Sequence, residues 1–182
     1  GLTADDAVNY GAIGVVIGHE IGHGYDDQGR KSDGDGILRD WWTEKDAEAY
    51  KANTQILVEQ FNGYSPVEGF NVNGQLTLGE NIGDLGGMTL AWSAYQKSLE
   101  GKPEPAEIDG LSAAERFFIG YAQIWRSKAR EASLRRGVLT DGHAPAQYRT
   151  YIVRNLDAWY KAFDVKPGDK LYKPKSERIQ IW

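Results

Sequence analysis

The chain has 182 residues, of which 41% are hydrophobic and 26% are charged, so it is long enough to bury the core of one globular domain. Its net charge is only -5 and its basic residues are scattered, which argues against nucleic acid as a partner. Because it has no cysteine, disulfides and thiolate metal sites are excluded, and any metal site must use His, Asp or Glu.

The sequence shows no targeting or membrane segment. Its apolar runs are much shorter than the roughly 20 residues of a membrane span, and no basic and then apolar signal segment opens it. We therefore expect no membrane segment in this chain. It begins with Gly1 rather than Met, which suggests a piece of a longer polypeptide.

The first part of the chain is expected to contain two helices. Thr3 is the candidate cap of the first helix, whose apolar spacing continues to about Tyr25. A polar loop rich in Gly and Asp follows at 31–38. Thr43 is the expected cap of a second helix that ends near Phe61.

The rest of the chain is expected to alternate between loops and three further helices. These helices are predicted at about 78–99, from the Ser112 cap towards Ala129, and at about 146–163. Irregular structure is predicted at 62–76, 101–110, in a short segment at 131–136, in a turn at 141–145 and in the tail 164–182. The sequence thus predicts a mainly helical domain.

Two of the three histidines, His19 and His23, are four residues apart in the first predicted helix. Residues four apart lie on one face of a helix, so both imidazoles could bind one ion. Glu20 is rotated by about 100° from His19, which keeps it out of the ligand set but near a metal-bound water. This H-E-x-x-H pattern is typical of zinc hydrolases, in which the glutamate is the general base. Short motifs also match by chance, and two partly buried histidines are the alternative.

Glycines surround this motif at positions 18, 22 and 24. Each costs a helix about 1 kcal/mol relative to alanine. We therefore expect a neighbouring backbone or a ligand to approach the helix closely at these positions.

A catalytic zinc usually has a third protein ligand and one open position. The metzincin continuation would need a glycine at position 26 and a histidine at position 29, where this chain has Asp26 and Gly29. Glu80 and Asp84, four apart in the third predicted helix, are another source. One could ligate zinc while the other accepts a hydrogen bond from a liganding imidazole. Taken alone, such a pair near a helix N-terminus more often interacts with the helix dipole.

Five segments resemble, in order, the catalytic region of the neprilysin and endothelin-converting-enzyme family of zinc metallopeptidases. They are GAIGVVIGHEIGHGYDDQGR, DWWT, LGENIGDLGG, FFIGYAQIW and DGHAPAQYR. The resemblance extends over nearly the whole chain. It implies a mainly α, zincin-like catalytic domain, with the zinc site between two helices and little or no sheet within this chain.

The resemblance also implies the zinc chemistry. His19, His23 and Glu80 match the three ligands of one zinc ion per chain. Glu20 matches the glutamate that activates the zinc-bound water, and Asp84 matches the aspartate that orients a zinc-binding histidine, here His19. Asp26 is interpreted only as a structural residue at the end of the helix.

The remaining matches concern the substrate. His143 matches the histidine that stabilises the oxyanion, Asp141 the aspartate that supports it, and Arg149 the arginine that binds a substrate carbonyl beyond the scissile bond. Four residues match the lining of the hydrophobic pocket for the residue after that bond: Val15, Val16, Ile124 and Trp125. From spacing alone, these four would be core residues, and His143 and Arg149 would be exposed surface residues.

The resemblance implies an endopeptidase that cuts short peptides and prefers a hydrophobic residue after the scissile bond. Family members are several times longer, so residues 1–182 are expected to be the carboxy-terminal catalytic region of a longer enzyme, with its upstream part as a partner. Animal members have cysteines where this chain has Ile56 and Ile179, which favours a bacterial origin. The resemblance also implies an extracytoplasmic location, either periplasmic or secreted.

Two alternatives remain open. One is a non-catalytic zinc-binding fragment or scaffold that needs its upstream part, although Glu20 and the open zinc position argue against it. The other is a different zinc hydrolase, such as a thermolysin-like peptidase. The DGH and PAQYR stretches favour the first family.

Overall fold

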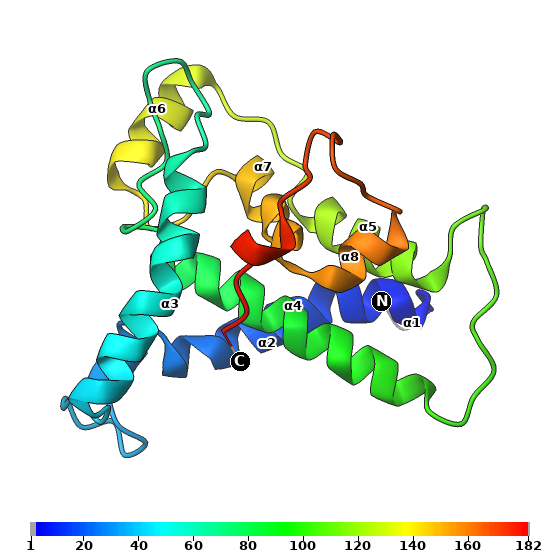
Figure 1. The fold of residues 1–182 in the computed structure, drawn as a ribbon, viewed down its shortest axis with the longest axis horizontal. Coiled ribbons are helices and arrows are strands. Elements are labelled where there is room, and N and C mark those ends of the chain that lie inside the picture. Colours follow the sequence, from blue (N-terminus) through cyan, green and yellow to red (C-terminus); the bar gives the residue numbers. More distant parts are fainter. Residues whose placement is uncertain (1–2, 182) are drawn as a thin grey trace.

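The computed structural model describes residues 3–181, and these are mostly helical (Figure 1). Gly1, Leu2 and Trp182 lie outside the described residues. The α-helices are α1 (Asp6–Asn9), α2 (Val15–Gly22), α3 (Glu44–Asn62), α4 (Leu78–Leu99), α5 (Ala113–Ile124), α6 (Glu131–Thr140), α7 (Ala146–Arg149) and α8 (Asp157–Ala162). Between residues 3 and 181 there is no strand, and only isolated antiparallel bridges such as Ser32–Leu38 form. The prediction of a mainly α fold with little or no sheet is confirmed.

One almost continuous helix carries the H-E-x-x-H motif. A π-helical turn, Tyr10–Gly14, joins α1 to α2, and a 3-10 turn, His23–Tyr25, ends the helix at the predicted residue. The predicted Thr3 cap is wrong, because Asp5 occupies the cap position and its carboxylate accepts a hydrogen bond of 2.8 Å from Arg116 of α5. The residue at the start of this helix is thus tied to α5 by a tertiary ion pair.

The other helix boundaries follow local signals in some places and tertiary contacts in others. The predicted caps Thr43 and Ser112 are confirmed, each in a capping box with the third helical residue. The helix predicted to run towards Ala129 ends at Ile124. Residues 131–136, predicted only as a short segment, belong to α6, which extends to Thr140.

The single helix predicted for 146–163 is wrong. It is divided into α7, a 3-10 turn at Thr150–Asn155 and α8, with Leu156 in an extended conformation. The Asn155 amide nitrogen donates to Gln60 Oε1 of α3 (2.9 Å), and its Oδ1 accepts from the Ile179 backbone (3.2 Å). These contacts with distant parts of the chain fix the break.

The C-terminal segment is irregular, as predicted, apart from a short 3-10 turn at Lys175–Glu177. Its Lys173 is only 7% exposed and donates hydrogen bonds to Gln60 Oε1 (2.8 Å) and Asn155 Oδ1 (3.2 Å). Burial, together with the nearby charge of Arg154, lowers the pKa of Lys173 to about 8. The segment is thus anchored by a buried polar network.

Helices α2 and α4 lie side by side and antiparallel (Figure 1), in contact along a row of glycines. A Cβ atom added to Gly18 would lie 2.8 Å from Gly87 Cα, and one added to Gly87 would lie 2.5 Å from the Val15 carbonyl oxygen. A Cβ on Gly83 would lie 2.8 Å from the His19 ring. No residue larger than glycine fits in this seam, so the glycines allow the two backbones to approach closely.

The predicted reason for the motif's own glycines is therefore correct at only one position. Gly18 is in the seam, whereas a Cβ on Gly22 would make an ordinary contact of 3.7 Å with Gly83. At Gly24 a Cβ would meet no described atom within 4 Å, so no neighbouring side chain or backbone explains that glycine, and the approach of a ligand there stays a prediction.

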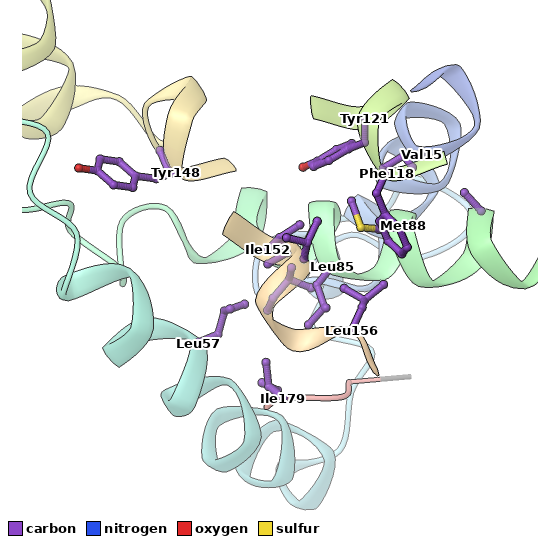
Figure 2. Close-up of a cluster of buried hydrophobic side chains, with 14 of the residues drawn as sticks. Val15, Leu57, Leu85, Met88, Phe118, Tyr121, Tyr148, Ile152, Leu156 and Ile179 are labelled. Atoms are coloured by element: carbon purple, nitrogen blue, oxygen red, sulfur yellow. The ribbon is translucent and has the colours of Figure 1, made fainter. Parts of the chain in front are cut away.

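The opposite side of α4 faces the main hydrophobic core (Figure 2). Leu85 and Met88 of α4 are at most 3% exposed. In Figure 2, Leu85 lies close to Ile152 and Leu156, which precede α8, whereas Met88 lies near Phe118 of α5, and Leu57 approaches from α3. Because α4 is covered on both sides, its first turn, which carries Glu80, has a fixed position relative to α2.

Candidate metal centre

Three potential zinc ligands converge where α2 meets the first turn of α4. His19 Nε2 lies 3.3 Å from Glu80 Oε2, and His23 Nε2 lies 3.5 Å from Glu80 Oε1. One ligand atom from each of the three residues lies within 4.8 Å of the others. The pair four residues apart and the distant carboxylate therefore meet as the sequence predicts.

Both imidazoles are held through their other nitrogen. His19 Nδ1 is 2.9 Å from Asp84 Oδ1, and His23 Nδ1 is 2.9 Å from Asp26 Oδ2. When each Nδ1–H donates to its carboxylate, each Nε2 presents a lone pair towards Glu80. The two rings are thus oriented for one shared ion.

Asp26 is the contact that the sequence analysis missed. Its Oδ1 accepts hydrogen bonds of 2.8 Å from the backbone N–H groups of Gln28 and Gly29, while Oδ2 faces His23. Asp26 is only 4% exposed. The available signal was a carboxylate three residues after the second histidine, at the point where the helix ends.

The residues fit a zinc ion. Two imidazole nitrogens and one carboxylate oxygen form a donor set that zinc accepts, and three protein ligands leave a coordination position open. The carboxylates behind both rings supply the outer partners that zinc-binding histidines usually have. His19, His23 and Glu80 could therefore hold the metal.

The charged side chains of the site stabilise one another. Burial disfavours the charged form of His19, but hydrogen bonds with Asp84 and Glu80 outweigh it and raise the pKa of His19 to about 9. Burial also opposes ionisation of Glu80, yet the hydrogen bond with His19 and the charges of His143 and Arg149 lower the pKa of this carboxyl group. The carboxylate of Glu80 is thus present in its ligating form at neutral pH.

Arg149 lies behind the ligands rather than on the surface. It is 7% exposed, and its Nε and Nη2 each donate to Asp84 over 2.8 Å. Nη2 also lies 3.4 Å from Glu80 Oε2, and the guanidinium is 4.0 Å from the centroid of the Trp125 ring. Asp84 therefore joins His19 to Arg149, a bidentate geometry that lysine could not reproduce.

His143, in the loop before α7, also reaches the Glu80 carboxylate. Its Nε2 is 3.3 Å from Glu80 Oε2, and its Nδ1 is 2.7 Å from Asp141 Oδ1. The same Asp141 oxygen accepts the backbone N–H of His143. Both hydrogen bonds lower the pKa of the Asp141 carboxyl group, and the bond from the backbone N–H has the larger effect.

All the predicted site residues but one line a single cleft of about 280 Å³. The exception is Asp141, which does not line the cleft but is hydrogen-bonded to His143, which does. Val15 is 1% exposed and also belongs to the core, whereas Ile124 is 42% exposed. Tyr121, which was not predicted, lines the cleft too, and its hydroxyl donates to the Arg149 carbonyl over 3.1 Å. The remaining lining residues are Val16, His19, Glu20, His23, Glu80, Asp84, Trp125, His143 and Arg149.

Comparison with known families agrees with this geometry. The model of peptidase family M13 matches residues 1–179. The chain belongs to peptidase family M13. This M13 chain is 41% identical to human endothelin-converting enzyme 1 over 97% of its own length, and 44% identical to neprilysin-11 of Caenorhabditis elegans over 86%. The resemblance to the neprilysin and endothelin-converting-enzyme family of zinc metallopeptidases is therefore confirmed.

Solved structures give the same result for the fold. The cryo-EM structure of the Mycobacterium tuberculosis zinc metalloprotease Zmp1 in an open state matches 99% of this M13 chain with 51% identity and a TM-score of 0.93. PepO from Lactobacillus rhamnosis HN001 matches 100% of it with 37% identity and a TM-score of 0.86. Because the relatives include animal and bacterial proteins, the bacterial origin expected from Ile56 and Ile179 stays a prediction.

The M13 chain spans only part of these relatives. It covers 23% of human endothelin-converting enzyme 1, 29% of the Zmp1 chain and 27% of the PepO chain. Among the residues that the structure describes, no helix has the length and apolarity needed to cross a membrane.

Proposed function

We propose that this chain is the catalytic region of a zinc metalloendopeptidase that hydrolyses short peptides. The observation that carries this proposal is the convergence of His19, His23 and Glu80, with both imidazole Nδ1 atoms held by carboxylates. One zinc ion per chain would occupy this set. The presence of Glu20 in the same cleft favours a catalytic role over a purely structural one.

A zinc ion bound there supplies a Lewis acid that polarises the peptide carbonyl and lowers the pKa of water. Glu20 acts as the general base: it accepts a proton from the attacking water and passes it to the departing amine. His143, oriented by Asp141, donates a hydrogen bond to the oxygen on which negative charge develops. Glu20 and His143 thus handle the proton and the charge respectively.

Substrate binding is assigned to the rest of the cleft. Arg149 uses Nε and Nη2 on Asp84, and no hydrogen bond from its Nη1 to another described residue is found. Nη1 is therefore the group we assign to a substrate carbonyl beyond the scissile bond. The apolar side chains that line the cleft favour a hydrophobic residue after that bond: Val15, Val16, Ile124 and Trp125.

The whole enzyme is proposed to be longer than this chain. Residues 1–182 would be its carboxy-terminal catalytic region, with the upstream part of the same polypeptide as a partner that restricts entry to short peptides. An extracytoplasmic location, periplasmic or secreted, belongs to the same proposal and rests on family resemblance.

The test compares the zinc-loaded chain with its Glu20→Gln variant on a quenched fluorescent peptide library. We expect the variant to keep about one zinc per chain, measured by atomic emission, and to lose hydrolysis. Cleavage products should begin with hydrophobic residues. Equal activity in both proteins would refute the role of Glu20, and binding of zinc without hydrolysis in either would support the scaffold alternative.

A further inference from the structure

Tyr121 of α5 is a buried residue of the zinc cleft to which the proposed reaction gives no role. It lies four residues before Trp125, so both rings are on the same face at the end of α5. Tyr121 is 1% exposed, and the two rings meet edge to face with their centroids 6.1 Å apart. A phenol buried in this way needs a partner for its hydroxyl group.

The partner of this hydroxyl group is the backbone of Arg149. Tyr121 Oη donates a buried hydrogen bond of 3.1 Å to the Arg149 carbonyl oxygen. Arg149 is the last residue of α7, which has only four residues and continues into the 3-10 turn at Thr150–Asn155. A helix of one turn is not stable by itself, so its position depends on contacts with the rest of the fold. The Tyr121 hydroxyl group thus ties the backbone of α7 to α5.

The side chain of Arg149 is held at its other end by α4. Its Nε and Nη2 each donate to Asp84 over 2.8 Å, and the guanidinium lies 4.0 Å from the centroid of the Trp125 ring. Asp84 is itself only 2% exposed. The carbonyl of Arg149 is therefore fixed by α5 and its guanidinium by α4. Holding both ends of a long side chain restricts its rotamers, and with them the direction in which Nη1 points.

We infer that Tyr121 is a positioning residue for Arg149, because its hydroxyl group fixes the main chain from which Nη1 is presented to the substrate carbonyl. The inference rests on the proposed function of Arg149. That carbonyl lies beyond the scissile bond and does not react, so the contact stabilises the bound substrate and the transition state alike. Loss of such a contact raises KM and leaves kcat unchanged.

Two tyrosine variants of the full-length polypeptide test this inference. Tyr121→Phe removes the hydroxyl group and keeps the ring. Tyr160→Phe of α8 is the control, because the Tyr160 hydroxyl group is also buried, donates to the Arg154 carbonyl over 2.7 Å and accepts from the Lys173 backbone over 3.0 Å. The control thus loses at least as many hydrogen bonds at a position that does not line the zinc cleft. For each protein, kcat and KM are measured on one peptide that the parent cleaves, together with the zinc content.

We expect Tyr121→Phe to raise KM about 3- to 10-fold, with kcat and zinc content unchanged, and Tyr160→Phe to leave KM unchanged. In an Arg149→Lys background, Tyr121→Phe should raise KM no further, because Nη1 is already absent. An unchanged KM in Tyr121→Phe would overturn the inference. An equal rise in Tyr160→Phe, or an undiminished rise in the Arg149→Lys background, would overturn it as well, since either result indicates general destabilisation.

A second measurement does not depend on hydrolysis. With arginine labelled by ¹⁵N, the Nε–H signal of Arg149 is assigned by its loss in Arg149→Lys, and its exchange with D₂O reports how firmly the guanidinium is held. We expect exchange to be about 3- to 10-fold faster in Tyr121→Phe and unchanged in Tyr160→Phe. Equal exchange in Tyr121→Phe and the parent would contradict the inference. A parent that cleaves no peptide would contradict only the proposed function, because this signal can still be compared.

Discussion

Substitution of Gly87 tests whether the close contact between α2 and α4 sets the positions of the zinc ligands. We expect Gly87→Ala to weaken zinc binding about 10- to 100-fold, which corresponds to about 1.4–2.7 kcal/mol. The new Cβ would lie 2.5 Å from the Val15 oxygen and 2.6 Å from the His19 nitrogen. Ordinary contact begins at 3.4 Å, so the helices must separate locally by about 0.9 Å. Overpacking of this kind costs about 1–3 kcal/mol.

The separation matters because the ligands belong to both helices. His19 and His23 would move with α2, whereas Glu80 would move with α4. Metal–ligand distances tolerate only about 0.2 Å, so a displacement of about 0.9 Å must weaken the bond to Glu80 or strain the side chain. The helices themselves should persist, since alanine favours a helix over glycine by about 1 kcal/mol.

Competition with a chromophoric chelator measures the zinc affinity, and circular dichroism checks the helical content. Gly22→Ala is the matched control, because its Cβ would lie 3.7 Å from Gly83 and cause no clash. If both variants bound zinc as tightly as the parent, the seam would not set the position of Glu80 and the reasoning would be refuted.

The Glu80→Ala variant should lose zinc on dialysis, whereas the control variant Glu48→Ala, which changes an exposed residue of α3, should keep it. Full retention of zinc by Glu80→Ala would contradict the ligand assignment. Asp26→Asn should lower zinc affinity about 10- to 100-fold, because it removes the charge behind His23 but keeps an acceptor for the turn; unchanged affinity in the chelator assay would limit Asp26 to the turn. Since the pKa of Lys173 is about 8 in the folded chain and 10.5 normally, the folded chain binds fewer protons between these values and its stability rises with pH. Relative to Lys173→Met, the parent should gain about 1–3 kcal/mol between pH 7 and 10.5 in urea unfolding, and a constant difference would contradict this.

Local sequence patterns predicted those features of the fold and of the site that depend on a single helix. His19 and His23 meet because residues four apart share a face, and the caps Thr43 and Ser112 depend only on their own first turns. The pairing with Glu80 followed from family resemblance, since spacing alone could not distinguish a ligand from a residue near the helix dipole.

What the sequence did not reveal depends on distant contacts. Asp5 rather than Thr3 occupies the first cap position, and its carboxylate pairs with Arg116 of another helix. The break before α8 depends on Asn155, whose partners lie on α3 and in the C-terminal segment. Such contacts exist only after the helices have packed, so a local reading of the chain assigns one helix where there are two.

The division of the ligands between α2 and α4 has a consequence for stability. His23 and Glu80 are separated by 57 positions, and the intervening chain includes all of α3. An ion held by both would close a loop of that length, and cross-links across such loops remove about 4 kcal/mol of entropy from the unfolded chain. In a polypeptide without cysteine, the metal would thus do for folding what a disulfide does in secreted domains.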